Sequence, residues 1–294
     1  MTIPIEASGR LRAVSSRFTL ATAERRVGAA AVCFGAPLDL TGSFRPGMGA
    51  GPAAVRRLSD SLETYSPALD RDLEDLTLVD LGDVDLEGLA VEEAVDAIAD
   101  AMEEAARIGR LPVMFGGEHT VSLGGFRGIR RIHPDAMVLQ LDAHADLRES
   151  YEGRALTHAT WAYHAGTEFG FDSLVQLGLR SGAREEWSRT RDTAWSSTKL
   201  ELSDAARESL SRHPVYLTVD IDVLDPSAAP GTGCPEPGGV TYAELEGFLH
   251  GLADLRVVAV DVVEVAPALD PSEITAAAAA KIMRDSVLMF GAGE

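Results

Sequence analysis

The chain has little cysteine, a shortage of basic residues and no long hydrophobic run, and each of these excludes a class of protein. Its two cysteines, Cys33 and Cys234, are too few for a disulfide framework. No apolar run approaches the ~20 residues that a bilayer span requires, so we expect no membrane segment. The first 28 residues carry arginines but no continuous apolar core, which is not the pattern of a secretory signal. We therefore expect a cytoplasmic enzyme.

Basic residues are outnumbered, because 26 lysines and arginines face 46 aspartates and glutamates, and the formal net charge is −20. Such a surplus repels phosphate groups and no basic cluster offsets it, so we expect no nucleic-acid partner. The surplus would attract a cationic substrate, and bound metal ions would neutralise part of it. It could equally be solvated surface that keeps the chain in solution, and composition alone leaves both interpretations open.

Strand-like and helix-like segments alternate from about residue 29 onwards, which is typical of a mainly parallel sheet covered by helices on both faces. We predict a single-domain three-layer α/β/α fold over residues 29–294, with residues 1–28 as an N-terminal segment that is packed on the domain or flexible. The predicted strands are residues 32–35, 76–81, 111–115, 136–141, 174–179, 215–219 and 256–263. The predicted helices are residues 51–60, 91–108, 120–130, 157–166, 202–211, 241–252 and 272–288.

Four short stretches carry carboxylates and histidines in an arrangement that suits a pair of divalent metal ions. The first three follow apolar strand-like segments, and the fourth is an acid within an apolar run. The stretches are Gly116-Gly117-Glu118-His119, Asp142-Ala143-His144-Ala145-Asp146, Asp220-Ile221-Asp222 with Asp225-Pro226, and Glu264. In open parallel sheets, ligands collect beyond the carboxyl ends of the strands, which is where the first three motifs lie.

Side chains two apart on a strand point the same way, so we expect Asp142, His144 and Asp146 to share a face, as Asp220 and Asp222 should. These acids need a cation, because burying an unpaired carboxylate costs several kcal/mol and the strands contain no lysine or arginine. Imidazole and carboxylate without thiolate suit Mn, Fe, Co or Zn better than a structural zinc cage.

These motifs, together with the loop Pro230-Gly231-Thr232-Gly233, resemble those of the ureohydrolase family, which includes arginases, agmatinases and related guanidino hydrolases. The resemblance runs from about Gly35 to Met289 in the family's order. It implies an arginase-like fold and two Mn²⁺ ions per chain, with water activated between the ions attacking the guanidinium carbon. It also implies a homo-oligomer, either a trimer or a hexamer.

The same resemblance implies two sets of metal ligands that share two bridging acids. One ion would be held by His119, Asp142, Asp146 and Asp220, and the other by His144, Asp142, Asp220 and Asp222. Asp146 would also aim the attacking water. Glu264 would pair with the guanidinium, and His158 would carry a proton to the departing amine. Glu118 should point away from the site on strand geometry, so we leave it out.

Within the family the chain is most similar to bacterial agmatinases, in segments 43–47, 62–67, 151–153 and 178–182. Agmatine, a small cationic guanidino compound that would give putrescine and urea, is therefore the expected substrate. Its positively charged amine tail could pair with acids such as Glu149, Glu152 or Glu236. Arg148 would instead suit the carboxylate tail of guanidinobutyrate or guanidinopropionate, so both tails stay open. Arginine is less favoured, since the loop after the second motif lacks the asparagine and serine pattern of arginases.

Two other classes would use a similar set of ligands. A two-metal phosphoesterase would need several positive groups near the metals, and the loops there offer only Arg148. A non-catalytic metal-binding scaffold would be expected to have lost a ligand, and this chain retains all of them. Ala145 and Cys234 depart from the family pattern at positions that are not ligands but that can alter hydrogen bonding around the metals. Cys234 is either a packing residue or part of a pocket wall.

Overall fold

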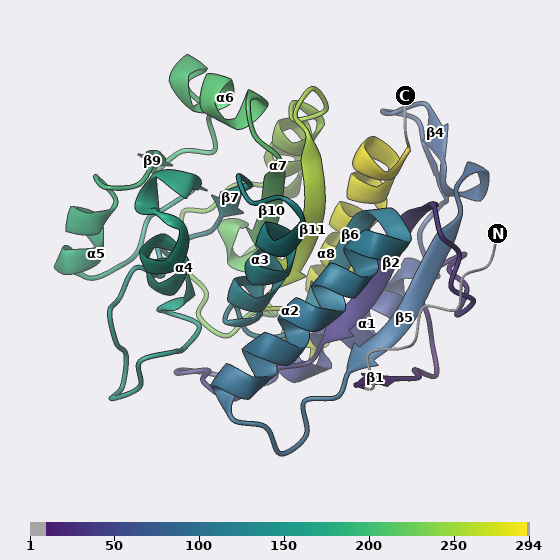
Figure 1. Ribbon diagram of the computed structural model, residues 1–294, viewed down its shortest axis with the longest axis horizontal. Coiled ribbons are helices and arrows are strands. Elements are labelled where there is room, and N and C mark those ends of the chain that lie inside the picture. Colours follow the sequence, from purple (N-terminus) through teal and green to yellow (C-terminus); the bar gives the residue numbers. More distant parts are fainter. Residues whose placement is uncertain (1–9, 293–294) are drawn as a thin grey trace.

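The computed structural model describes residues 10–292, in which a central sheet is covered by helices (Figure 1). The strands of this 9-stranded sheet lie in the order β1-β5-β2-β6-β11-β10-β7-β8-β9. Among the described strand pairs of this sheet, only β1–β5 is antiparallel. They are β1 (Leu11–Arg12), β2 (Ala29–Ala36), β5 (Leu78–Val84), β6 (Gly109–Gly116), β7 (Met137–Leu141), β8 (Leu174–Leu177), β9 (Trp195–Ser197), β10 (Val215–Asp220) and β11 (Val257–Val263). A separate antiparallel ribbon pairs β3 (Tyr65–Ser66) with β4 (Arg71–Asp72).

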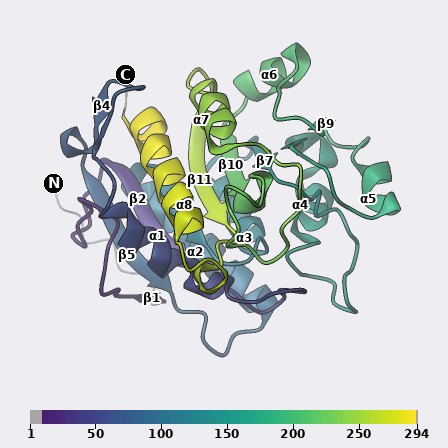
Figure 2. The same cartoon turned by 180° about the vertical axis from the view of Figure 1, so that it is seen from behind.

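Helices cover both faces of the sheet, so the molecule has three layers. The helices are α1 (Gly51–Ser59), α2 (Val91–Ile108), α3 (Val121–Ile132), α4 (Trp161–Phe169), α5 (Arg184–Arg189), α6 (Asp204–Ser211), α7 (Tyr242–His250) and α8 (Ile274–Ser286). Helices α2 and α3 lie over the face seen in Figure 1, and α1, α7 and α8 lie over the opposite face, which Figure 2 shows. The predicted single-domain α/β/α fold with a mainly parallel sheet is confirmed.

Alternate residues of the central strands enter two hydrophobic cores, one under each helical layer. In β6, Val113 and Phe115 join the core that contains Ile282 of α8, whereas Met114 between them joins the core beneath α2 and α3. β7 is buried along its whole length. Burial on both faces explains why these strands read as apolar runs rather than as alternating patterns.

Four neighbouring strands in the middle of the sheet, β6, β11, β10 and β7, are parallel and therefore end at the same edge. The sequence motifs lie at these ends: His119 follows β6, Asp142 follows β7, Asp220 ends β10 and Glu264 follows β11. The strands are neighbours in space but not in sequence. As a result His119 and Glu264, 145 positions apart, meet at this edge.

The first described residues pack against the sheet. β1 pairs with β5, and Phe18 is 1% exposed, with its ring centroid 5.5 Å from that of Phe115. Residues 1–9 of the predicted N-terminal segment lie outside the described residues. Among the helices of residues 10–292, none combines the length and the apolar character that crossing a bilayer requires.

One predicted helix begins later than expected. The pattern predicts a helix over residues 157–166, whereas α4 begins at Trp161. The Thr160 hydroxyl accepts from the backbone N–H of Thr157 at 2.8 Å and donates to the Thr157 carbonyl at 3.1 Å. Such side-chain bonds compete with the backbone bonds of a first helical turn. His158 therefore lies in a loop and not on a helix.

A buried ion pair joins α1 to β5. Arg56 is 1% exposed, and its Nε lies 2.8 Å from Oδ2 of Asp80, whose side chain is 0% exposed. Removing one partner of a buried pair leaves an uncompensated charge, so we expect Arg56→Met to lower the free energy of unfolding by about 3–5 kcal/mol. Arg57→Met replaces the exposed neighbour that pairs with Glu273 and should lower the free energy of unfolding far less, because solvent screens this pair. Urea unfolding followed by circular dichroism measures both values, and equal losses would contradict this expectation.

Candidate metal centre and active site

The imidazole of His119 lies among three carboxylates beyond the ends of β6, β7 and β10. Its Nδ1 is 3.0 Å from Asp142 Oδ2, 3.1 Å from Asp146 Oδ2 and 3.2 Å from Asp220 Oδ2. All four side chains are buried. The sequence predicts these residues as one set of metal ligands, and the fold brings them together.

The second predicted set gathers around His144. Its Nδ1 is 3.0 Å from Asp222 Oδ2 and 3.7 Å from Asp142 Oδ1, so Asp142 turns one oxygen towards each imidazole. One ligand atom from each of His119, Asp142 and Asp220 lies within 4.8 Å of the others, and the same holds for Asp142, His144 and Asp222. Two clusters that share an acid in this way suit a dinuclear metal site.

Asp220 is the last residue of β10, and the other candidate ligands lie in the segments that follow β6, β7 and β10. β7 ends before Asp142 and β10 ends at Asp220, so the expectation that these side chains share one face of a strand is wrong. Each turn is instead held by its own acid. Asp142 Oδ1 accepts from the backbone N–H of His144 at 2.6 Å, and Asp220 Oδ1 accepts from that of Asp222 at 2.8 Å. In each motif the first acid therefore stabilises the turn that positions the following ligands.

This group of side chains requires positive charge. Burial, with Asp222 and Asp142 nearby, raises the pKa of Asp220 well above its usual range. Burial and the charge of Asp142 likewise raise the pKa of Asp146 to about 6. His119 Nδ1 is buried with no hydrogen-bond partner among the described residues, while three carboxylate oxygens face it. Cations would stabilise the buried carboxylates in their ionised form and would give His119 Nδ1 a partner. Imidazole nitrogen with carboxylate oxygen suits Mn, Fe, Co or Zn. The side chains present therefore fit two metal ions.

Residues behind the cluster fix its orientation. His119 Nε2 lies 3.0 Å from Thr218 Oγ1, so the ring presents Nδ1 to the carboxylates. Asp146 Oδ2 accepts from Trp161 Nε1 at 2.8 Å. The φ of Asp146 is 52°, in the left-handed region that aspartate tolerates better than most residues. Outer partners of this kind set the orientation and basicity of metal ligands.

Glu264 lies directly after β11 and is 6% exposed. Its Oε1 accepts from the backbone N–H of His119 at 2.6 Å, which holds the carboxylate beside the first cluster. Burial raises the pKa of Glu264 to about 8. Its φ of 66° is uncommon for a glutamate, and residues held in such conformations cluster at functional sites. A buried carboxylate in this position favours a cationic partner.

His158 lies on the loop before α4, between two hydroxyl groups. Its Nδ1 is 3.3 Å from Thr41 Oγ1, and its Nε2 is 3.3 Å from Ser43 Oγ. Burial lowers the pKa of His158 below its ordinary value. The ring is therefore mainly neutral at pH 7 and can accept a proton.

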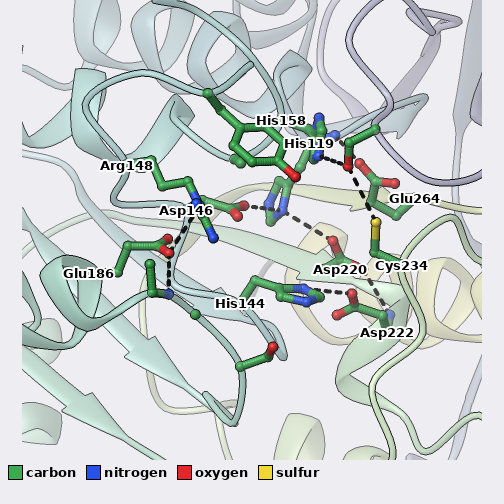
Figure 3. Close-up of a pocket in the computed structure, with 16 residues that line it drawn as sticks. His119, His144, Asp146, Arg148, His158, Glu186, Asp220, Asp222, Cys234 and Glu264 are labelled. Atoms are coloured by element: carbon green, nitrogen blue, oxygen red, sulfur yellow. Dashed lines mark hydrogen bonds and ion pairs between the residues drawn. The ribbon is translucent and has the colours of Figure 1, made fainter. Parts of the chain in front are cut away.

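The candidate residues other than Asp142 line a cavity of about 310 Å³, large enough for a small organic molecule. In Figure 3, Arg148 and Glu186 lie on one side of it, and His158, Cys234 and Glu264 lie on the other. The lining consists of Ser43, His119, His144, Asp146, Arg148, Tyr151, His158, Ala159, Ser181, Gly182, Ala183, Glu186, Asp220, Asp222, Cys234 and Glu264. Cys234 thus forms part of the pocket wall, whereas Cys33 is a buried core residue.

Glu186 was not predicted from the sequence, although it lines the cavity and is only 3% exposed. Its Oε2 lies 3.1 Å from Arg148 Nε and accepts from the backbone N–H of Ala183 at 2.7 Å. A glutamate three residues after a helix N-cap was the available signal, but it predicts a capping role and not a pocket. Three acids were expected to bind an amine tail, and none of them is among the described residues that line the cavity. They are Glu149, Glu152 and Glu236.

Glu118, which the sequence places outside the site, is not among the residues that line the cavity. Its side chain is nevertheless fully buried, and Thr41 donates a hydrogen bond to it at 2.7 Å. Thr41 is the residue that contacts His158. Strand geometry does not apply to Glu118, because β6 ends at Gly116.

Comparison with known proteins agrees with this fold. The chain belongs to the arginase family, whose model matches residues 29–289, and it is therefore an enzyme of the ureohydrolase class. It is 40% identical over 265 residues to the agmatinase of Bacillus subtilis (strain 168), an alignment that covers 88% of this chain and 91% of that protein. It is 33% identical over 270 residues to the guanidinobutyrase of Pseudomonas aeruginosa, covering 87% and 85% respectively.

A solved structure shows the same fold. Proclavaminate amidino hydrolase from Streptomyces clavuligerus is similar to this chain with a TM-score of 0.86 and 29% identity, over 97% of this chain and 99% of that one. The family and the arginase-like fold predicted from the metal motifs are confirmed.

Proposed function

We propose that this chain hydrolyses agmatine to putrescine and urea with two bound Mn²⁺ ions. The observation that carries the proposal is the convergence of two histidine–aspartate clusters, Glu264 and His158 on one small cavity. The 40% identity to the Bacillus subtilis agmatinase supports agmatine as the substrate. The family resemblance further supports a cytoplasmic homo-oligomer, a trimer or a hexamer, that acts in polyamine biosynthesis.

The two clusters would hold the two ions, with Asp142 and Asp220 shared. The first set is His119, Asp142, Asp146 and Asp220, and the second is His144, Asp142, Asp220 and Asp222. When bound, the ions supply positive charge that activates water at neutral pH and stabilises the charge of the transition state.

The chain's own residues then bind the substrate and move its protons. The carboxylate of Glu264 matches the planar N–H groups of a guanidinium and binds them through charge-assisted hydrogen bonds. Asp146 accepts a hydrogen bond from the attacking water and aims it at the guanidinium carbon. His158 delivers a proton to the amine nitrogen, which keeps the electron pair of the breaking C–N bond. The oxygen of the water ends in urea, and both hydrogens of the water end on the amine, one delivered by His158 and the other passed on by Asp146, which accepts a hydrogen bond from the water.

The outer part of the cavity favours an amine tail over a carboxylate tail. Arg148 is the one arginine among the described residues that line the cavity. Its Nε lies 3.1 Å from Glu186, and its guanidinium carbon lies 4.7 Å from the ring centroid of Tyr151. The charge of Arg148 is therefore neutralised before a substrate arrives. The same pairing argues against a phosphoesterase, which would need free positive groups. The 33% identity to a guanidinobutyrase keeps a carboxylate-tailed substrate as the second candidate.

Urea release from Mn²⁺-loaded protein tests the proposal across agmatine, guanidinobutyrate, guanidinopropionate and arginine. We expect kcat/KM for agmatine to exceed that for guanidinobutyrate by at least about tenfold, because a charge left without a partner costs ~1–3 kcal/mol. Glu186→Gln frees Arg148 and should narrow this ratio. If guanidinobutyrate is the better substrate of the unmodified protein, Arg148 reads the tail and the choice of agmatine is wrong, although the metal chemistry stands.

A further inference from the structure

Glu118 is a fully buried carboxylate with four hydrogen-bond donors around it, and it lies outside the metal clusters. Its Oε2 accepts from the backbone N–H groups of Leu40 and Thr41 at 2.8 and 2.6 Å. Its Oε1 accepts from the hydroxyls of Thr41 and Thr120 at 2.7 and 2.9 Å. Glu118 therefore anchors the loop after β2 whose residues Thr41 and Ser43 flank His158.

Four groups lie within hydrogen-bond distance of the Thr41 hydroxyl, and one of them, Thr120 Oγ1 at 3.3 Å, gives its own hydrogen to Glu118 and so donates none to Thr41. A hydroxyl has one donor hydrogen and two acceptor lone pairs. The hydrogen is donated to Glu118 Oε1. One lone pair accepts from the backbone N–H of His158 at 3.0 Å, and the other faces His158 Nδ1 at 3.3 Å. Because Thr41 has no second hydrogen to donate, Nδ1 must be the donor in that contact.

The opposite ring nitrogen is then the acceptor. His158 Nε2 lies 3.3 Å from Ser43 Oγ, a residue of the cavity lining, so Ser43 donates to it. We propose that Glu118, acting through Thr41, holds neutral His158 in the tautomer with Nδ1 protonated and Nε2 bare towards the cavity. This inference rests on the proposed function, in which His158 carries the proton to the amine. Glu118 and Thr41 are positioning residues, because neither is among the residues that line the cavity.

The arrangement gives His158 a defined direction of proton transfer. Nε2 accepts a proton from the attacking water, and the same atom gives it to the amine nitrogen as the C–N bond breaks. The Nδ1 proton stays on Nδ1 throughout, held by Thr41. While the ring is an imidazolium, the negative charge of Glu118 stabilises it through the polarised Thr41 hydroxyl. Without this link the ring can adopt the other tautomer, whose Nε2 already carries a hydrogen and cannot accept one.

Thr41→Val tests the link because it keeps the shape of the side chain and removes the hydroxyl. We expect kcat for agmatine to fall about tenfold, the effect of losing one hydrogen bond to a charged group. We expect KM and metal content to change less than about twofold, since Thr41 belongs neither to the cavity lining nor to the candidate metal ligands. Thr41→Ser restores the hydroxyl and should restore kcat. Thr120→Val is the matched comparison, because the Thr120 hydroxyl bonds Glu118 but not the His158 ring, and its effect should be smaller.

A double-mutant cycle separates this role from a general structural one. His158→Asn alone should lower kcat about a hundredfold or more, and adding Thr41→Val to it should lower kcat no further. An equal loss from Thr41→Val in both backgrounds would overturn the inference. Full activity of His158→Asn would instead overturn the proposed role of His158 itself.

Nitrogen-15 NMR of the histidine rings gives a readout that does not depend on activity or on agmatine. The protein is loaded with diamagnetic Zn²⁺, which suits the same ligands, because Mn²⁺ is paramagnetic, and the His158 signals among those of 7 histidines are assigned from their loss in His158→Asn. The expected spectrum has a protonated Nδ1 and a bare Nε2, and Thr41→Val should mix the two tautomers. A protonated Nε2 in the unmodified protein would overturn the inference whatever the substrate proves to be.

Discussion

Asp220→Asn is expected to abolish Mn²⁺-dependent urea release, lowering kcat by at least about a thousandfold. Asp220 faces His119 at 3.2 Å, and its other oxygen accepts from the backbone of Asp222, so it lies between the two clusters. Losing the ions removes several kcal/mol of transition-state stabilisation, and ~4 kcal/mol corresponds to about a thousandfold in rate. Elemental analysis should find fewer than two ions per chain. Asp142→Asn should behave in the same way, because Asp142 faces both imidazoles.

The stability of Asp220→Asn should move in opposite directions with and without metal. Burial raises the pKa of Asp220, so the ionised group destabilises the metal-free fold as pH rises above the ordinary range for an aspartate. Asparagine removes that penalty, and the metal-free variant should melt above the metal-free parent at neutral pH. With each ion at a hundredfold excess over its Kd, the parent gains about 2.7 kcal/mol per site and the order reverses.

Asp96→Asn is the control, since Asp96 is exposed and pairs with Arg127 on the surface. It should change neither the metal content nor the activity. Two tightly bound ions in a fully active Asp220→Asn protein would show that Asp220 is not a bridging ligand.

Glu264→Gln is expected to lower kcat/KM by about 10²–10³ for every guanidino substrate, because breaking a buried charge pair costs ~3–4 kcal/mol. Glutamine keeps the size of the side chain, and its amide oxygen can still accept the N–H of His119, so the fold and the metal cluster should persist. The guanidinium is common to agmatine and guanidinobutyrate, so the two substrates should lose similar factors. Parallel measurement of kcat/KM for both, with metal content, checks this expectation.

Glu273→Gln provides a matched control for that change. Glu273 also has a left-handed backbone, with φ 60°, but its side chain is 38% exposed and pairs with Arg57. Its replacement should leave kcat/KM unchanged. A loss confined to agmatine in Glu264→Gln would mean that Glu264 reads the tail and not the guanidinium.

How well each element could be predicted depended on whether its determinants are local. The helix predicted over residues 91–108 matches α2 to the residue, because Ala94, Ile98 and Met102 recur on one buried face over its whole length. The start of α4 could not be read from such periodicity, since the Thr160 hydroxyl decides it through a side-chain bond. The short elements α5 and β9 were not predicted, because six and three residues are too few to show a period.

The candidate site divides in the same way. Carboxylates directly after apolar strands identify the metal motifs, since a buried acid without a cation is unstable, and this holds although the expected strand geometry is wrong. Glu118 and Glu186 depend on distant partners. Two of the donors to Glu118 are backbone N–H groups 77 and 78 positions away, which no residue identity reveals. Glu186 reaches Arg148 only after the chain has folded around the cavity.

The order of the central strands has a consequence for how the protein is made. β6 and β7 follow one another in the chain, but β11 and β10, which come late in synthesis, lie between them in the sheet. While a ribosome has made only the first half of the chain, His119 and Asp142 therefore have no Asp220 between them and cannot form either complete ligand set. Neither predicted ligand set is complete in such a nascent chain, so we expect tight metal binding only once the sheet is complete.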